Sequence, residues 1–495
     1  MKLNYKRTML VGFAFFLIMA FWGAYDAIVP LALTNHFGLP QDLSGAVMSL
    51  DNVLAVFMLP IFGAISDKLN SKYGKRTPFI FVGTVLAVVA FVCLTFIDNM
   101  QIANVLGSGQ DIPALREEAT NALKNVHELY KNHTIDKATY DGMLEAAEAR
   151  VKEIDDLTYE ITKANVGPLV GFIAVLLVSL IAMSTFRSPA VALMPDVTVK
   201  PLRSKGNAVI NLMGTAGGII ILVFGMIFGT SKHLYMEYTR YVIAVCAVML
   251  VGLVVFMLFV KEKRWAKEMQ EETLRLGIEE TPKDEEPQEK RKLSKPEIAS
   301  LILLLASVAL WYIGYNAITS KYSVYATNFL GFDYNLTLIV AQAAAVVSYI
   351  PVGIIASKIG RRRSILIGVA ILMISFLAAS FITSDSSPVV MYILFASAGI
   401  GWATINVNSF PMVVELAKGG DVGKYTGYYY TASMAAQIVT PIFSGFLVEK
   451  IGWSIFFPYA AFFVALSFVT MYFVKHGDSK AEKVSMLEAL GGADD

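Results

Sequence analysis

Two aspartates, Asp26 and Asp51, stand inside long apolar stretches of the sequence. A charge in the middle of a membrane costs about 2.5–3.5 kcal/mol on insertion scales, so each is a candidate for function. If the two face each other, one of them could bind a proton, because burial and mutual repulsion both penalise a pair of negative charges. They are therefore candidates for carrying a cation across a membrane. The simpler alternative is that each carboxylate caps or hydrogen-bonds a neighbouring helix.

A basic residue, Arg187, closes the fourth apolar stretch. The simplest explanation is that its long side chain reaches out to the membrane surface. The alternative is that it pairs with an aspartate or binds the hydroxyl groups of a substrate.

Side chains suited to a hydroxyl-rich ligand occur in both halves of the chain. Such a ligand needs amides and acids for its hydroxyls and an aromatic ring for its apolar face. Amides inside a helix bundle also hold helices together, and this alternative applies to each of them. The candidates for substrate binding are Trp22, Tyr25, Asn52, Arg187, Tyr315, Asn316, Asn406, Asn408 and Gln437.

The elements that must position these residues are twelve apolar runs, because a membrane span needs about 20 mostly apolar residues. The chain has 495 residues, 56% hydrophobic and 16% charged, whereas a soluble domain carries roughly 25% charged residues. We predict an all-α membrane protein with twelve transmembrane helices in two six-helix halves. The runs are 8–34, 42–66, 77–98, 166–187, 206–230 and 239–260, then 298–320, 335–356, 364–384, 388–412, 424–448 and 452–474.

Charged segments divide the chain into domains. The N-terminal half comprises 1–98 and 166–260, and the C-terminal half comprises 298–474. A charged linker, 261–297, joins them, and 475–495 forms a tail. Lys and Arg crowd into the loops after spans 2, 4 and 8, which places those loops, the linker and both termini in the cytoplasm.

The remaining segment, 99–165, falls outside the membrane on the opposite, extracellular side. Its apolar residues recur at helical spacing, which predicts a small helical hairpin between spans 3 and 4. The simplest interpretation is that this hairpin is a dispensable insertion.

Two loops at corresponding positions of the halves resemble each other. The loop after span 2 runs from Gly63 through Asp67 to Gly74, Lys75 and Arg76, and a shorter copy follows span 8. We expect Asp67 to pair at a neighbouring helix terminus, while the two bases hold the loop at the anionic inner leaflet. Such a latch would stabilise the state closed on the cytoplasmic side. Its candidate residues are Asp67, Lys75, Arg76, Arg361 and Arg362.

Ordinary membrane topology is the alternative for this latch. It accounts for the three arginines of the second copy, because Ser357 stands there in place of the acid.

These loops and several other segments resemble the major facilitator superfamily, and more narrowly its glycoside–pentoside–hexuronide:cation symporters and sucrose/proton symporters. The resemblance covers all twelve spans but not 99–165. It implies import of a glycoside or disaccharide coupled to H⁺ or Na⁺. The segments that carry it are Leu59-Pro60-Ile-Phe-Gly63-Ala-Ile-Ser-Asp67, Gly74-Lys75-Arg76-Thr77-Pro78-Phe79, Ser188-Pro189-Ala190-Val191-Ala192-Leu193-Met194-Pro195-Asp196, Gly401-Trp402 ahead of Asn406, and Gly427-Tyr428-Tyr429-Tyr430.

Three positions depart from the family pattern. Val191 stands where sucrose symporters typically carry an arginine. Ala55 and Leu59 stand where the melibiose-type sodium carriers place two acids on span 2. A proton is therefore a better candidate for the coupled cation than sodium.

We expect a secondary transporter that imports a sugar with H⁺ by alternating access. It would be a monomer in the plasma membrane, with no cofactor, no metal and no nucleic-acid partner. The sequence contains no nucleophile–base pattern or HExxH metal motif, which disfavours an enzyme. A proton-coupled efflux carrier for amphipathic small molecules is the alternative, but its pocket would hold fewer amides.

Overall fold

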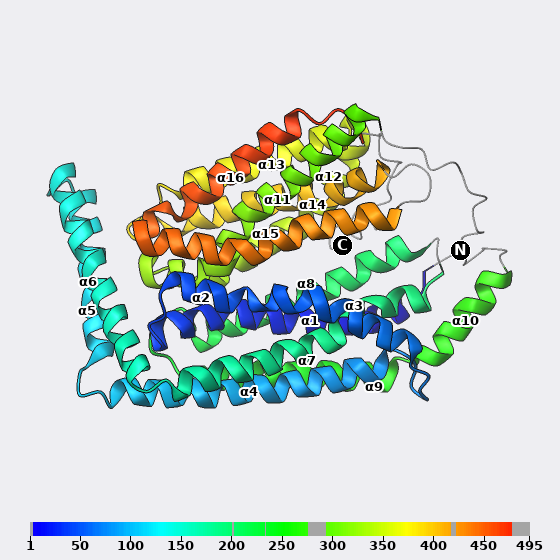
Figure 1. Cartoon of the computed structure of the whole chain (residues 1–495), viewed down its shortest axis with the longest axis horizontal. Coiled ribbons are helices and arrows are strands. Elements are labelled where there is room, and N and C mark those ends of the chain that lie inside the picture. The colour runs from blue at the N-terminus through cyan, green and yellow to red at the C-terminus, as the bar shows by residue number, and fades with distance from the viewer. Residues whose placement is uncertain (1–2, 200–201, 233, 276–293, 417–421, 478–495) are drawn as a thin grey trace.

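A computed structural model of the chain describes residues 3–199, 202–232, 234–275, 294–416 and 422–477. Its regular elements over these residues are helices (Figure 1). Eleven helical segments among them are long and apolar enough to cross a membrane. A shorter apolar helix, Tyr334–Tyr349, stands at the position of the eighth predicted span. The fold class predicted from the sequence is therefore confirmed.

The helices form two bundles, one from each half of the chain (Figure 1). The N-terminal bundle contains α1 (Tyr5–Leu31), α2 (Gln41–Met48), α3 (Leu50–Lys68), α4 (Thr77–Leu106), α7 (Gly167–Val197), α8 (Arg203–Phe228) and α9 (Thr239–Phe259). The C-terminal bundle contains α11 (Lys295–Val324), α12 (Tyr334–Ile359), α13 (Arg361–Ala379), α14 (Pro388–Glu415), α15 (Val422–Ile451) and α16 (Phe456–Tyr472). The π-helical turns η1 (Ala32–His36) and η3 (Tyr325–Leu330) extend α1 and α11, and a 3₁₀ turn, η4 (Trp453–Ile455), precedes α16.

Three further helices lie outside the bundles. The segment predicted as a hairpin forms α5 (Ile112–Lys131) and α6 (Lys137–Ala164), and it starts later than predicted because α4 continues to Leu106. Part of the predicted linker is helical, as α10 (Glu262–Arg275). The rest of that linker, 276–293, and most of the tail, 478–495, lie outside the described residues.

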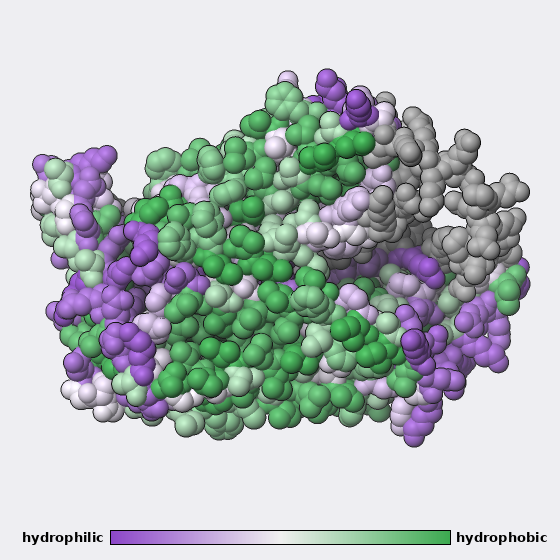
Figure 2. All heavy atoms as spheres, in the orientation of Figure 1, coloured by the Kyte–Doolittle hydropathy of each residue, from purple (hydrophilic) through white to green (hydrophobic). Residues whose placement is uncertain are grey.

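The two ends of the molecule differ. We call the end that carries α5 and α6 the hairpin end, and the end that carries α10, the first turn of α1 and the last turn of α16 the termini end (Figure 1). Apolar residues cover the middle of the surface, and hydrophilic residues gather towards the two ends (Figure 2). This pattern is that of a bundle set in a bilayer with its two ends in water.

The halves touch closely at the hairpin end, where α2 packs against α15. A Cβ atom on Gly45 would lie 1.9 Å from the Pro441 carbonyl oxygen, and one on Gly445 would lie 2.1 Å from the Gln41 carbonyl oxygen. Only glycine allows backbones to approach so closely. At the termini end the helices of the two halves diverge (Figure 1). We therefore interpret the structure as closed at the hairpin end and open at the other.

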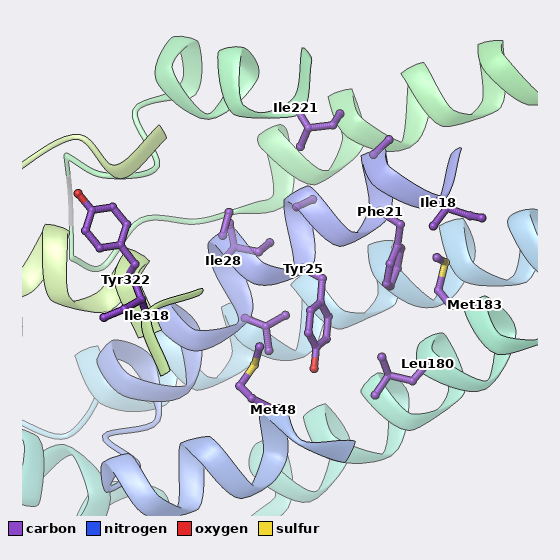
Figure 3. Packing of buried hydrophobic residues seen from close by; sticks show 14 of the residues in the cluster. Ile18, Phe21, Tyr25, Ile28, Met48, Leu180, Met183, Ile221, Ile318 and Tyr322 are labelled. Atoms are coloured by element: carbon purple, nitrogen blue, oxygen red, sulfur yellow. The ribbon is translucent and has the colours of Figure 1, made fainter. Parts of the chain in front are cut away.

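Helix α1 lies at the centre of the N-terminal bundle. Its buried side chains pack against α2, α7, α8 and α11, which explains why the helix is apolar on every face. Figure 3 shows part of this cluster: Ile18, Phe21, Tyr25, Ile28, Met48, Leu180, Met183, Ile221, Ile318 and Tyr322. The backbone of α1 is therefore fixed by packing on several sides, and so are the positions from which its side chains reach towards the other half.

Candidate functional site

A cavity of about 270 Å³ lies between the two halves. Its lining comes from α1, α2, α3 and α7 of the N-terminal half and from α11 and α15 of the C-terminal half. Most of the lining side chains are polar or aromatic. The lining residues are Met19, Trp22, Tyr25, Asp26, Met48, Asp51, Asn52, Arg187, Asn316, Thr319, Ser320, Gln437 and Pro441.

Helix α1 supplies the aromatic side of the cavity. Met19, Trp22 and Asp26 are spaced by three and four residues, which places them on one face of the helix. The rings of Trp22 and Tyr25 meet edge to face, with centroids 5.2 Å apart. This arrangement offers a ring face and a carboxylate side by side.

The two predicted aspartates do line the same cavity, Asp26 from α1 and Asp51 from the first turn of α3. The side-chain amide of Asn52 donates a hydrogen bond of 2.7 Å to Asp51 Oδ1. Asp51 also interacts electrostatically with Asp26 and with Arg187. Asp51 therefore lies within electrostatic range of both the other acid and the base of the cavity.

Arg187 does not reach out to the membrane surface, and this correction has a simple cause. Helix α7 continues to Val197, because Pro189 and Pro195 are accommodated inside it. Arg187 thus lies ten residues before the helix end, about 15 Å along the axis. Its guanidinium stacks over the Trp22 ring, 5.7 Å from the centroid, and forms no salt bridge with a described acidic residue.

The C-terminal half contributes hydroxyls and amides. Asn316, Thr319 and Ser320 follow one another on the face of α11 that lines the cavity, and Gln437 faces them from α15. The Asn316 side-chain amide donates to the Tyr312 carbonyl oxygen at 2.9 Å. This bond orients the Asn316 side chain and leaves its amide oxygen able to accept from another donor. These groups match a ligand rich in hydroxyls.

Three predicted substrate residues are not among the cavity lining. The Tyr315 ring stacks flat on Trp402, with centroids 3.6 Å apart. Asn408 is buried and donates to the Thr404 carbonyl oxygen of its own helix at 2.9 Å. Asn406 lies one turn from Trp402 on α14 and also stands outside the lining set. The Asn408 amide is thus bonded within its own helix, away from the cavity lining.

Asp67 of the predicted latch pairs with Arg76 at the start of α4, within an ion-pair network. Arg76 is 5% exposed and therefore does not lie at the lipid headgroups. Its guanidinium binds Asp67 at 2.5 Å and Asp196 at 2.7 Å, and it also donates to the Ser66 hydroxyl. Burial alone would lower the pKa of Arg76, but the hydrogen bonds and charges of Asp196 and Asp67 raise it above its usual value. All these partners belong to one half, so the network forms while the termini end is open.

Glu262 is a partner that the sequence did not reveal. Its carboxylate accepts the backbone N–H groups of Lys75, Arg76 and Thr77 at 2.6–2.9 Å, together with the Thr77 hydroxyl at 2.7 Å. It thereby caps α4 from a distant segment. Gly74 has φ +121° and presses against this carboxylate, so a Cβ there would lie 2.2 Å from Glu262 Cδ.

The second copy of the loop also forms an ion pair. Arg361 pairs with Glu415 at the end of α14, and Arg362 donates to the Tyr472 carbonyl oxygen. Topology alone therefore does not account for Arg361, because its acid comes from another helix instead of position 357.

Two buried polar groups were also missed, both near the hairpin end. His36 Nδ1 lies 2.7 Å from Asp98 Oδ1, and the two side chains are 0% and 3% exposed. Lys321, 1% exposed, donates to the Gln41 carbonyl oxygen at 2.8 Å. Their partners are remote in sequence, so spacing gives no signal for them.

The family model described as Major Facilitator Superfamily matches residues 163–418 and 334–489, and one described as MFS/sugar transport protein matches 10–106. The Proton-associated sugar transporter A of Mus musculus is 35% identical over 95 residues, 19% of this chain and 11% of that protein. This chain thus spans about a tenth of the length of that relative. An MFS-type transporter of Methanocaldococcus jannaschii is 25% identical over 296 residues, covering 58% and 68% of the two chains.

Solved structures of the same fold cover almost the whole chain. The inward-open xylose transporter XylE from E. coli has a TM-score of 0.61 at 14% identity, covering 98% of this chain and 99% of that one. A bacterial homologue of the iron transporter ferroportin, in an inward-facing state, scores 0.59 at 13% identity, covering 95% and 99%. The nucleoside transporter NupG scores 0.54 at 13% identity, covering 94% and 100%. Since these transporters are named for unlike cargoes, the likeness shows the fold alone, and the cargo has to be inferred from the residues of the cavity.

Proposed function

The chain belongs to the major facilitator superfamily and is a multi-pass membrane transporter, and from this premise we propose that it imports a sugar or glycoside together with a proton. The observation that carries the proposal is the composition of the central cavity. Two carboxylates, an arginine that forms no salt bridge with a described acid, several amides and hydroxyls, and a half-buried tryptophan ring line one space between the halves. Sugar recognition needs this combination of groups.

The substrate lies against Trp22, whose ring face covers the apolar face of a pyranose. Asn316 and Gln437 exchange hydrogen bonds with its hydroxyls from the opposite half. The guanidinium of Arg187 donates to two neighbouring oxygens at once, because its N–H groups form a planar fork. A ligand held in this way bridges the two halves.

The proton is carried by Asp26 and Asp51. While both are ionised, Arg187 is attracted to them and is less able to bind the sugar. A proton on one carboxylate lowers that attraction, so that Arg187 turns to the substrate. When the proton is lost on the other side of the membrane, Arg187 returns to the acids and the affinity for the sugar falls. Transport of the sugar and transport of the proton are linked in this way.

The orientation of the transporter in the membrane is proposed from its basic loops. The basic loops with Arg76 and Arg361 lie at the termini end, which we assign to the cytoplasm. The structure is then open to the cytoplasm and closed to the outside, the state in which an importer releases its cargo. The alternating state would open the hairpin end and close the termini end.

Uptake of radiolabelled disaccharides and glycosides into proteoliposomes tests this function. We expect accumulation when the lumen is more alkaline than the medium, and none when only a sodium gradient is imposed. The double variant Asp26→Asn with Asp51→Asn should bind sugar but not accumulate it. Accumulation that ignores the pH gradient, or that survives the double variant, contradicts proton coupling. If no sugar enters but amphipathic compounds leave, the protein is an efflux carrier.

A further inference from the structure

The α5–α6 hairpin is firmly built into the N-terminal half. Arg116 is 3% exposed, pairs with Asp155 and donates to the Val151 carbonyl oxygen at 3.0 Å, which ties α5 to α6. The hydroxyl of Thr162 donates to the Phe37 carbonyl oxygen at 2.8 Å, just after α1. The hairpin therefore moves with the N-terminal half and not as a loose appendage.

The turn after α1 fits directly under α6. Gly38 has φ +63°, and a Cβ on it would lie 2.6 Å from both the Asp155 carbonyl oxygen and the Tyr159 nitrogen. Such a close backbone contact admits glycine alone. It adds a second anchor for the hairpin on the N-terminal half.

The same hairpin also reaches the C-terminal half through a charge pair. In Figure 1 it rises along the end of the molecule, from the N-terminal bundle to the level of the C-terminal one. Lys152 Nζ on α6 lies 2.9 Å from Glu449 Oε1 and donates to the Glu449 carbonyl oxygen at 3.1 Å. Glu449 stands at the end of α15, so this contact joins the two halves.

An apolar contact lies beside this charge pair. Phe329, on η3 of the C-terminal half, packs against a small cluster of Leu123, Val126 and Ala147 on the hairpin. The His127 ring meets the Phe329 ring edge to face, with centroids 6.4 Å apart. Near it, Gly331 leaves room for Lys124, since a Cβ there would lie 2.9 Å from Lys124 Cε. The hairpin thus contacts the C-terminal half at two places, Glu449 and the Phe329–Gly331 segment.

The charge pair is continuous with the contacts that shut the cavity at the hairpin end. The other oxygen of Glu449 accepts the Gln41 backbone N–H, the first of α2, at 3.0 Å. The carbonyl oxygen of Gln41 accepts from the buried Lys321 at 2.8 Å. Lys152, Glu449, Gln41 and Lys321 therefore form one polar chain that crosses between the halves three times.

From these contacts we propose that the α5–α6 hairpin is a strap that holds the hairpin end closed, with Lys152 as its charged clasp on Glu449. In alternating access the halves must separate at this end, and every contact of the strap with α15 and η3 must then break. The strap consequently favours the state open at the termini end. The hairpin is on this account a working part and not the dispensable insertion that its sequence suggested. The proposal depends on alternating access and is independent of the cargo.

Distance measurements by double electron–electron resonance (DEER) in lipid nanodiscs test the strap without any substrate. The chain contains two cysteines, so the Cys93→Ser, Cys246→Ser background is free for labelling. Spin labels at Leu106→Cys and Ser387→Cys, both exposed at the hairpin end, report the separation of the halves. The variant Lys152→Glu places like charges opposite each other, and we expect the ratio of long to short distances to rise about two- to fivefold.

Lys163→Glu is the matched control. Lys163 lies on the same helix and is similarly exposed, but its partner Glu160 belongs to the hairpin itself. This variant should leave the distances unchanged. Lys152→Gln, which removes a charge without adding one, should give a smaller shift in the same direction. The strap is refuted if Lys152→Glu leaves the distance distribution of the parent unchanged, or if Lys163→Glu shifts it equally.

Discussion

At the scale of single residues, Arg187 is the group on which the proposed coupling depends. Its guanidinium lies at the cavity over the Trp22 ring and within electrostatic range of Asp51, and no described acid forms a salt bridge with it. An arginine in this position can exchange partners, whereas one held in a tight ion pair cannot. A lysine ammonium could supply the charge but not the planar fork of donors.

The variant Arg187→Lys separates the charge of this residue from its geometry. It keeps the positive charge near Asp51 but loses the bidentate donors and the stacking, so we expect the KM for sugar to rise about 10-fold or more, the loss of one to two hydrogen bonds to a charged group. Initial uptake rates over a range of sugar concentrations measure this. Arg264→Lys, on the exposed face of α10, serves as control and should behave as the parent protein. An unchanged KM in Arg187→Lys would remove this residue from the substrate site.

At the scale of elements, the ends of helices depend on partners that are remote in sequence. Glu262 caps α4 from the start of α10, and Asp196 at the end of α7 holds Arg76. Hydrophobicity predicts where such helices run, but it does not say which acid satisfies their first N–H groups. For the same reason Arg187 was predicted at a helix end: Ser188 and Pro189 suggest a break, yet a membrane helix accommodates proline when neighbouring helices support it.

The tip of the hairpin contains a titratable contact outside the membrane spans. Burial lowers the pKa of His127 below its usual 6.5, although the charge of Asp385 opposes this shift. The folded tip therefore disfavours the protonated ring, and its stability is lost as the pH falls through 6.5 towards the lower folded-state pKa. We expect hydrogen-exchange protection of residues 126–147, corrected for intrinsic rates, to weaken between pH 7.5 and pH 5.5.

Two variants isolate this effect. His127→Gln still accepts a hydrogen bond from the Tyr140 hydroxyl, which lies 2.9 Å from the ring nitrogen, and should abolish the loss of protection. Burial raises the pKa of nearby Glu148, which acts in the opposite direction, so the comparison must be made against the parent protein. His133→Gln, at the exposed turn, should retain the full pH response. Equal responses in all three proteins would contradict the assignment to His127.

At the scale of the whole molecule, much of the architecture could be predicted from hydrophobic length and basic loops. Twelve runs, two halves and a separate hairpin follow from patterns within short stretches of sequence. The cavity could be predicted only in part. Asp26 and Asp51 are recognisable by the cost of a charge inside a membrane, and Asn316 as an amide suited to hydroxyl groups, whereas Lys321 and the His36–Asp98 pair were overlooked. Lys321 and its partner Gln41 are far apart in the sequence, and His36 and Asp98 belong to different spans. Only the packed structure brings each pair into contact.

The closed hairpin end rests on helices that approach at glycine. In Gly445→Ala the new methyl group would stand 2.1 Å from the Gln41 carbonyl oxygen, so α2 and α15 must move apart. We expect a loss of about 1–3 kcal/mol in stability, seen as a lower midpoint of thermal unfolding in detergent. Gly427→Ala on the same helix meets nothing within 4 Å and should not lower the midpoint. Equal midpoints for the two variants would show that close contact at Gly445 contributes nothing.

The central claim is that sugar and proton cross together, and the pH of a weakly buffered proteoliposome suspension tests it most directly. Sugar is added without any imposed gradient while labelled uptake and external pH are recorded in parallel. The account predicts that the medium turns alkaline in proportion to the sugar that enters, and that Asp26→Asn with Asp51→Asn abolishes the change. Sugar entry with no movement of protons, or no entry for any glycoside, would contradict it.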